Sequence, residues 1–339
     1  MLRPEGIMTV EPTMAEPEAK ISPARRPLRI ELITESIAPA ADGVLVVTFR
    51  SADGGLVPGW APGAHISLQL ENGLQRQYSL CGDLHDRDRW RIAVLQENES
   101  RGGSLWLHTH LREGHRLLAE GPYNNFALED SDEYILVAGG IGITPILPMV
   151  RELDRRGANW RLLYGGRRRA GMAFIDALEA FGDRVVIRPE DEHGLLDLSS
   201  WISAPKTSTA VYCCGPERLL QAVEAVSVNW PDGALHLERF RPRPVAAEGE
   251  SGSFEVMLAK SGQTFLVGAN ETIIEALDRV GLYVPRSCGE GTCGTCLTKV
   301  IDGIPDHRDS FLIGKKRSTN TAICVCCSRS KTPRLTLDL

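Results

Sequence analysis

The chain has 339 residues, of which 42% are hydrophobic and 24% are charged, so we expect a soluble protein of two or three domains. Lys and Arg total 38 against 44 Asp and Glu, and the net charge of -6, without any basic block, argues against a nucleic-acid-binding protein. The longest uncharged run, residues 134–150, contains three glycines and two prolines, which argues against a membrane span.

The first segment of the chain has the composition of a tail. Residues 1–27 contain five prolines and no apolar segment of the kind that a signal peptide needs. We interpret them as disordered and expect a cytoplasmic monomer. Because no secretion signal is present, disulfides among the nine cysteines are not expected.

Short β patterns separated by turn signals follow the tail. We expect strands over 28–33, 44–50, 65–70, 76–80 and 91–96, and a short helix over 103–111. Many short strands at close spacing favour a small antiparallel β-barrel over residues 28–129.

Two places in this barrel carry side chains suited to a ligand. Alternation puts Arg76 and Tyr78 on one face of a strand and Ser79 on the other, and a cation beside a ring suits a flat ligand with an anionic tail. A second candidate, before the helix, is an anion site of free amides and a cation, formed by Arg101, Gly102, Gly103 and Ser104. The alternatives are a surface pair and an ordinary helix cap.

Near residue 130 the pattern changes to alternating strands and helices. Strands are expected over 134–138, 160–164, 184–188 and 210–213, and helices from about 145 to 156, over 172–181 and over 217–228. This order predicts a doubly wound α/β domain over residues 130–240. Its glycine-rich turns fall at the carboxyl ends of strands, where such sheets bind ligands, and contain Gly139, Gly140, Gly142, Cys214, Gly215 and Pro216.

Residues 241–252 have the composition of a linker, and a third domain is expected over 253–339. A hairpin over 254–258 and 264–267 and a helix over 272–280, with Glu271 or Thr272 near its cap, precede the three cysteines Cys288, Cys293 and Cys296. These cysteines follow the C-x4-C-x2-C spacing of plant-type [2Fe–2S] ferredoxins, whereas zinc sites favour paired C-x2-C units. Together they predict a β-grasp ferredoxin domain.

The fourth cysteine ligand must come from the run over residues 322–327, which contains Cys324, Cys326 and Cys327. We expect this run to be a strand, so alternation places Cys324 and Cys326 on one face and Cys327 on the other. Alternation alone leaves the choice between Cys324 and Cys326 open.

The order of these parts resembles the phthalate dioxygenase reductase family, which includes the vanillate demethylase reductases. The resemblance covers residues 28–339 and rests on Arg-x-Tyr-Ser, Gly-Gly-Ile-Gly-Ile-Thr-Pro, Cys-Gly-Pro and the cysteine spacing. It implies FMN, NADH and a terminal Rieske-type oxygenase component as electron acceptor. The family's Cys-x-Ser-Arg pattern also identifies Cys326 as the fourth cluster ligand.

The resemblance also implies roles for the residues at matching positions. It places Arg76, Tyr78 and Ser79 on the FMN, the 101–104 turn on its phosphate and Thr144 near its ring system. The nucleotide would lie against Gly139, Gly140, Gly142, Cys214, Gly215 and Pro216. Because the cofactors carry the chemistry, no acid–base residue is expected. One departure is Asn124-Asn125, where the family often has Arg-Asn, and this puts one flavin or nucleotide contact in doubt.

Two questions stay open in the sequence. Arg167 to Arg169 would suit the 2′-phosphate of NADPH, whereas Glu190 to Glu192 would suit the ribose of NADH, and the resemblance favours NADH. The alternatives to the whole assignment are an FAD-type reductase for a haem or di-iron hydroxylase, and an iron–sulfur electron carrier or redox sensor without enzyme activity.

Overall fold

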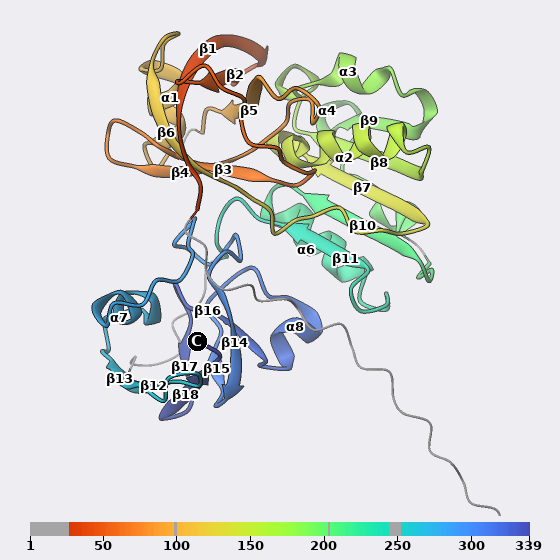
Figure 1. Ribbon diagram of the computed structural model, residues 1–339. Coiled ribbons are helices and arrows are strands. Elements are labelled where there is room, and N and C mark those ends of the chain that lie inside the picture. The colour runs from red at the N-terminus through yellow and green to blue at the C-terminus, as the bar shows by residue number, and fades with distance from the viewer. Residues whose placement is uncertain (1–26, 98–99, 203, 244–251) are drawn as a thin grey trace, which may run out of the picture.

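The structure, a computed structural model, describes residues 27–97, 100–202, 204–243 and 252–339. The predicted tail and most of the predicted linker lie outside these residues. Three main sheets follow one another along the chain, and we name the regions around them the barrel, central and C-terminal domains (Figure 1). No helix within the described ranges is both long enough and apolar enough to cross a membrane.

The barrel domain is an antiparallel sheet of six strands in the order β4-β3-β6-β1-β2-β5. A bridge between Leu80 and Ile92 joins its two edges, which confirms the predicted barrel. The elements are β1 (Arg29–Ala41), β2 (Val44–Ser51), β3 (His65–Gln69), β4 (Gln75–Ser79), β5 (Arg89–Leu95), α1 (Gly103–Thr109) and β6 (Arg116–Tyr123). Strand β6 is absent from the predicted set because its Gly121-Pro122 pair reads as a turn.

The central domain is a parallel sheet of five strands in the order β11-β10-β7-β8-β9. Its strands are β7 (Glu133–Gly139), β8 (Asn159–Gly166), β9 (Val185–Pro189), β10 (Thr209–Cys214) and β11 (Leu235–Glu238). The chain moves outward from β7 to β9 and then returns to β10, so the strand order reverses between β7 and β10. A sheet of this kind binds its ligand at that reversal, beyond the carboxyl ends of the strands.

Helices cover both faces of the central sheet, as a doubly wound fold requires. They are η1 (Gly140–Gly142), α2 (Ile143–Arg155), η2 (Arg169–Gly171), α3 (Ile175–Glu179), η3 (Gly182–Arg184), α4 (Glu190–His193), α5 (Leu198–Trp201) and α6 (Glu217–Val226). Helix α2 packs in one hydrophobic cluster and α6 in another. The helix expected over 172–181 is shorter, because Phe174 at its N-cap has a φ of 65° and cannot continue a right-handed helix.

The C-terminal domain has a mixed sheet in the order β13-β12-β18-β14-β16, with β12 and β18 parallel. Its elements are β12 (Phe254–Leu258), β13 (Thr264–Val267), α7 (Ile273–Arg279), β14 (Leu297–Asp302), β15 (Pro305–Asp306), α8 (Gly314–Ser318), β16 (Ala322–Cys324), β17 (Arg329–Ser330) and β18 (Arg334–Leu337). Thr272 caps α7 in a capping box with Glu275, which identifies Thr272 rather than Glu271 as the N-cap residue.

The strand expected over 322–327 is wrong in its second half. Strand β16 ends at Cys324, and the next three residues form a turn in which the Cys327 and Ser328 amides donate to the Cys324 carbonyl. Alternation therefore does not place Cys326 on the same face as Cys324, and the position of each thiol depends on the turn.

Candidate functional site

The loop that carries Cys288, Cys293 and Cys296 lies between α7 and β14, and its glycines set its shape. Gly291 has a φ of 73°, and a Cβ there would collide with the sulfur of Cys327. The tight loop directs two amides at one thiol, since Glu290 N and Thr292 N donate to Cys288 Sγ over 3.3 and 3.4 Å. Amide hydrogen bonds of this kind help to set the potential of an iron–sulfur cluster.

The turn after β16 separates the three candidates for the fourth ligand. The buried Cys326 thiol lies within hydrogen-bonding reach of both Cys288 and Cys296. Cys324 reaches Cys296 but is not among the groups that act on Cys288. Cys327 instead packs against the backbone of the loop. Cys326 is thus the candidate that contacts both ends of the cysteine run.

Four thiols therefore form a connected set, because Cys293 also lies next to Cys288, and it holds the pKa of Cys288 well below the usual range for a thiol. A [2Fe–2S] cluster takes four cysteines, two for each iron. In the part of the chain that the structure describes, no three His, Cys, Asp or Glu side chains are arranged around a single metal ion. A set of four cysteine thiols fits a two-iron cluster.

The structure brings the two predicted parts of the flavin site together. Arg76 on β4 donates to the carbonyl of Arg101 over 2.7 Å, and a Cβ on Gly103 would lie 2.6 Å from the Arg76 side chain. Glycine at the start of α1 thus lets the helix approach β4. The Ser79 hydroxyl is buried and has no hydrogen-bond partner among the described residues. Buried polar groups are normally hydrogen-bonded, so this hydroxyl is a candidate partner for a polar atom of a ligand.

Two further residues of this predicted site are placed by neighbouring contacts. Burial raises the pKa of Tyr78, which packs against the hydrophobic core of the barrel. The Ser104 hydroxyl lies 3.0 Å from that of Ser100, and the amide of Gly102 donates to the same Ser100 hydroxyl over 3.1 Å. The turn before α1 is therefore held by its own side chains, and it keeps the start of this helix next to Arg76.

The two predicted nucleotide turns lie side by side, because Ala138 of β7 is paired with Cys214 of β10. A Cβ on Gly215 would lie 3.0 Å from the Gly139 Cα, and a Cβ on Gly142 would collide with the Cys214 carbonyl. Close packing of the chain is thus sufficient to require glycine at these three positions. The same packing places both turns at the reversal of strand order.

The other predicted residues of the turns differ in exposure to a ligand. Gly140 has a φ of 54° and no atom within 4 Å of its Cβ position, so its backbone faces open space before the start of α2. A Cβ on Gly139 would lie 2.7 Å from Pro216, which begins the N-terminal turn of α6. The Thr144 hydroxyl, in contrast, is buried and donates to the Ile141 carbonyl over 2.9 Å.

Glu238 is a candidate residue that the sequence analysis misses. It ends β11, opposite Cys214, and its Oε2 atom is buried without a hydrogen-bond partner in the described ranges. Burial raises the pKa of this carboxyl to about 8. A buried group with such a pKa beside a predicted ligand turn is a functional candidate. The sequence does contain a signal for this residue. In an alternating α/β pattern, the helix over 217–228 predicts a further parallel strand, and Glu238 lies at the carboxyl end of that strand.

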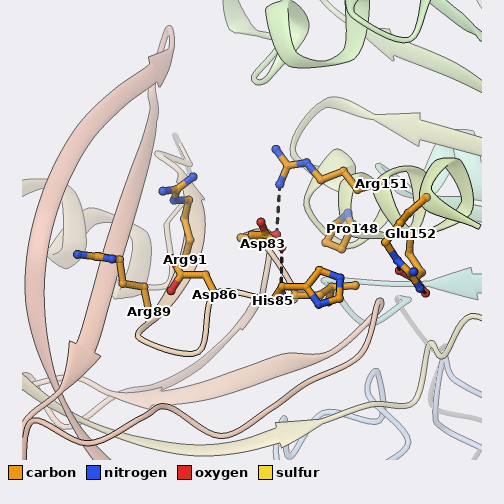
Figure 2. A pocket seen from close by; sticks show the side chains of 11 residues that line it. Asp83, His85, Asp86, Arg89, Arg91, Pro148, Arg151 and Glu152 are labelled. Carbon is orange, nitrogen blue, oxygen red and sulfur yellow. Dashed lines mark hydrogen bonds and ion pairs between the residues drawn. The ribbon is translucent and has the colours of Figure 1, made fainter.

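A cavity of about 390 Å³ lies elsewhere, between the loop over residues 82–91 and helix α2 (Figure 2). None of the predicted site residues lines it. Arg155 pairs there with Glu152 over 2.8 Å, and Arg151 donates to the carbonyls of Cys81 and Gly82. Because these arginines are engaged within the protein, we assign no ligand to this cavity.

Comparison with known proteins agrees with this geometry. The family described as "2Fe-2S iron-sulfur cluster binding domain" matches residues 256–331. The phenoxybenzoate dioxygenase subunit beta of Ectopseudomonas oleovorans is 44% identical over 313 residues, which cover 91% of this chain and 97% of that protein. The vanillate O-demethylase oxidoreductase of a Pseudomonas strain, HR199, is 39% identical over 317 residues, which cover 91% and 100%.

Two solved structures are also similar to this chain. Phthalate dioxygenase reductase, described as a modular structure for electron transfer from pyridine nucleotides to [2Fe–2S], is 36% identical with a TM-score of 0.66, over 92% of this chain and 98% of that one. An intact self-sufficient cytochrome P450 monooxygenase is 38% identical with a TM-score of 0.82, over 95% of this chain. The match spans only 43% of that longer chain.

Identities above 30% over nine-tenths of the chain are decisive for membership of a family. They agree with the cysteine set, which lies within the residues that the iron–sulfur family model matches. The chain uses a flavin, a [2Fe–2S] cluster and a pyridine nucleotide, and it belongs to the phthalate dioxygenase reductase family of flavin iron–sulfur oxidoreductases.

Proposed function

We propose that this chain passes electrons from NADH through FMN and a [2Fe–2S] cluster to a terminal Rieske-type oxygenase or demethylase component. The barrel domain, residues 28–129, takes the FMN, and the central domain, residues 130–240, takes the NADH. The C-terminal domain, residues 253–339, holds the cluster on Cys288, Cys293, Cys296 and Cys326, and residues 241–252 link it to the rest.

The observation that carries this proposal is the ion pair between Arg101 and Glu290. Arg101 belongs to the turn proposed to hold the FMN phosphate, and Glu290 lies between Cys288 and Cys293. The pair joins the barrel domain to the cysteine loop, 189 residues further along the chain. The proposed flavin and cluster sites therefore lie next to each other, as electron transfer between them requires.

The residues of the chain bind and orient, and the bound groups react. A flavin accepts two electrons from NADH as a hydride, leaving NAD⁺, and can release them singly to a one-electron cluster. Arg76 and the 101–104 turn supply positive charge and amides for the phosphate. The unpartnered Ser79 hydroxyl is available to a polar atom of the ring system. The 139–142 and 214–216 turns bind the nucleotide, and Ile141 of the first turn packs against a hydrophobic cluster that includes Val44 and Ala93 of the barrel.

Three finer points of the proposal have separate support. FMN rather than FAD follows from the resemblance to phthalate dioxygenase reductase, which the 36% identity of that solved structure supports. A Rieske-type acceptor follows from the relatives, since one is named as a dioxygenase subunit and another as an O-demethylase oxidoreductase. The acidic helix α4 of the central domain supports NADH, since carboxylates suit a ribose diol and repel a 2′-phosphate.

The proposal is tested on the purified full-length protein. Chromatography of the flavin released by denaturation should yield FMN, and iron analysis should give two irons per chain, as a [2Fe–2S] cluster requires. NADH should then reduce a purified Rieske-type oxygenase component, and each equivalent of NADH should supply two equivalents of one-electron acceptor. A protein that binds the cluster but no flavin, or that fails to oxidise NADH, would instead be an electron carrier.

A haem protein is the second candidate acceptor. The match to the self-sufficient P450 covers nearly this whole chain at a TM-score of 0.82, so a similar reductase arrangement serves a protein that contains a P450. Reduction of an isolated P450 haem domain under carbon monoxide, measured beside reduction of the Rieske component, separates the two. Faster reduction of the haem protein would replace the proposed acceptor without affecting the route from NADH to the cluster.

A further inference from the structure

Ser287, the residue before the first cluster cysteine, is held by two side chains of the barrel domain. The amide nitrogen Nε2 of Gln77 donates to the Ser287 carbonyl over 2.8 Å. Nε2 of His65 lies 3.3 Å from the Ser287 hydroxyl. Ser287 and His65 are buried, and Gln77 is partly buried, so both contacts lie largely out of solvent.

The two barrel residues come from paired strands and share one face. In the register of β3 and β4, His65 is opposite Ser79 and Ser67 is opposite Gln77. Because side chains alternate along a strand, Gln77 points away from the face that carries its neighbours Arg76 and Tyr78. The segment that carries the flavin motif thus presents its other face to the cysteine loop.

Further contacts fix the same loop at other points. Beyond the Arg101–Glu290 pair, Asn125 donates to the Thr295 hydroxyl over 3.2 Å, between Cys293 and Cys296. The Arg101 pair is partly exposed, with side chains 46% and 37% accessible, and such pairs contribute little. The buried contacts to Ser287 are therefore the ones that can hold Cys288 in a single position.

We propose that Gln77 and His65 are positioning residues, which hold Cys288 against strand β4 and so set the separation between the flavin and the cluster. This inference rests on the proposed function, since it assigns residues to the step between its two centres. The rate of electron transfer falls steeply with separation, so a small displacement of Cys288 is costly. Uncharged hydrogen-bonding groups can fix the backbone there without adding a charge beside the cluster.

The test replaces Gln77 by Met in the full-length protein, which keeps the length of the side chain but removes its donor. Flavin content, iron content and NADH oxidation by ferricyanide should stay unchanged. Reduction of the cluster after mixing with NADH, followed by stopped-flow absorbance, should slow about tenfold. Amide hydrogen exchange at residues 287–295 should become faster in the oxidised protein, which is a readout independent of turnover.

Matched variants separate this role from a general loss of structure. Gln75→Met makes the same substitution on the same strand, at a residue that contacts Glu120 on the surface. It should change neither the rate of NADH oxidation by ferricyanide nor the rate of cluster reduction. Ser287→Ala removes the contact to His65 but keeps the carbonyl, so it should have a smaller effect than Gln77→Met, and Ser287→Thr should restore the wild-type rate.

The outcomes distinguish this inference from the proposed function. Normal cluster reduction and normal exchange in Gln77→Met would overturn the positioning role while leaving the electron route intact. A wild-type protein in which NADH reduces the flavin but never the cluster would overturn the route itself. An equal slowing in Gln75→Met would show that the effect belongs to the strand and not to the contact with Ser287.

Discussion

Cys326 is distinguished from its two neighbouring cysteines by the thiols that it contacts. It reaches Cys288 and Cys296, whereas Cys324 reaches only one of these and Cys327 packs against the loop backbone. We therefore expect Cys326→Ser to abolish cluster assembly, and Cys324→Ser and Cys327→Ser to retain it. The measurements are iron per chain and visible absorbance. Normal iron in the Cys326→Ser protein would return the fourth ligand to one of the other two cysteines.

Glu238 should make the stability of the protein fall as the pH rises from about 4.5 to about 8. Burial raises its pKa from an ordinary 4.5 to about 8. Between these values the folded state retains a proton that the unfolded state has released, so the stabilisation is complete below pH 4.5 and is lost as the pH rises through 8. The upper limit of this loss is about 1.4 kcal/mol for each pH unit in that window.

Glu238→Gln removes this titration and keeps the shape of the side chain. The melting temperature of the wild-type protein should fall more than that of the variant between about pH 6 and about pH 9. Parallel curves for the two proteins would show that the carboxyl is already charged at neutral pH. Loss of NADH affinity in the variant at neutral pH would additionally connect Glu238 with the nucleotide.

At the scale of elements, the two glycine turns of the central domain depend on each other. Gly142 has an ordinary helical φ of -62°, so it is required by space and not by its backbone conformation. In Gly142→Ala the Cβ would meet the Cys214 carbonyl, and we expect a loss of about 2–3 kcal/mol together with weaker nucleotide binding.

Gly182→Ala provides the matched control in the same domain. Gly182 has a φ of 61° but open space around its Cβ position, so the change costs only local strain of about 1 kcal/mol. Nucleotide binding should be unchanged there. Urea unfolding and NADH titration of both variants are the measurements, and an equally mild effect of Gly142→Ala would show that the two turns can move apart.

The choice between NADH and NADPH depends on two adjacent segments of the central domain. The amide of Asp191 in α4 donates to the carbonyl of Arg167 over 3.3 Å, so the acidic and basic runs meet. Arg169 is already paired with Glu179 over 2.5 Å, which leaves less positive charge for a 2′-phosphate. We expect kcat/KM for NADH to exceed that for NADPH by about tenfold, equivalent to ~1.4 kcal/mol. Equal efficiencies would show that the basic run prevails.

Local signals predicted most elements of the three domains, and long-range contacts account for what they missed. The start of α7 is a local signal, because Thr272 and Glu275 form a capping box and are only three residues apart. A helix start of this kind can be located from the sequence alone. The end of β16 at Cys324 has no such local signal. The residues that follow are valine and cysteine, which could equally continue the strand. The contact between His65 and Ser287 joins residues 222 apart, and no periodicity in one sequence reveals such a pair.

At the scale of the whole molecule, the placement of the domains is a variable of its own. Two solved relatives have nearly equal identity to this chain, 38% and 36%, but TM-scores of 0.82 and 0.66. In a chain of three domains, a TM-score over the whole chain depends on how the domains are placed as well as on the fold of each domain. The contacts between the domains therefore decide which arrangement this chain adopts.

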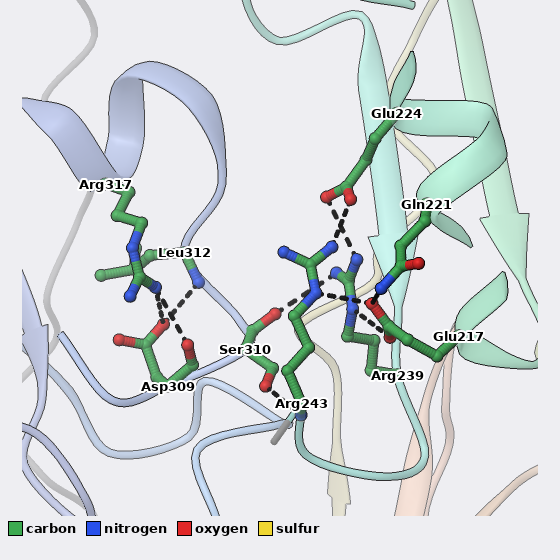
Figure 3. A network of polar contacts seen from close by, with 9 residues as sticks. All are labelled: Glu217, Gln221, Glu224, Arg239, Arg243, Asp309, Ser310, Leu312 and Arg317. Atoms are coloured by element: carbon green, nitrogen blue, oxygen red, sulfur yellow. Dashed lines mark hydrogen bonds and ion pairs between the residues drawn. The ribbon is translucent and has the colours of Figure 1, made fainter. Parts of the chain in front are cut away.

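The contact between the central and C-terminal domains is a network of charges (Figure 3). Arg239 and Arg243 both pair with Glu217 and Glu224 of helix α6. Arg239 also donates to the Ser310 carbonyl over 3.3 Å, and the amide of Arg243 donates to the Ser310 hydroxyl over 2.7 Å. The Ser310 amide in turn donates to the Gly291 carbonyl of the cysteine loop.

Arg239→Met should therefore loosen the C-terminal domain as well as destabilise the protein. The Arg239 side chain is only 2% exposed, and its loss removes charged hydrogen bonds, but Glu217 and Glu224 keep their pairs with Arg243, so the cost should be about 2 kcal/mol. Small-angle scattering should show a larger radius of gyration, and hydrogen exchange at residues 305–312 should become faster. Arg116→Met is the control, because its pair with Glu31 is more than half exposed and contributes less than about 1 kcal/mol. A variant that loses stability but keeps the wild-type radius and exchange would show that the network stabilises the central domain alone, and that the barrel contacts are sufficient to hold the cluster in place.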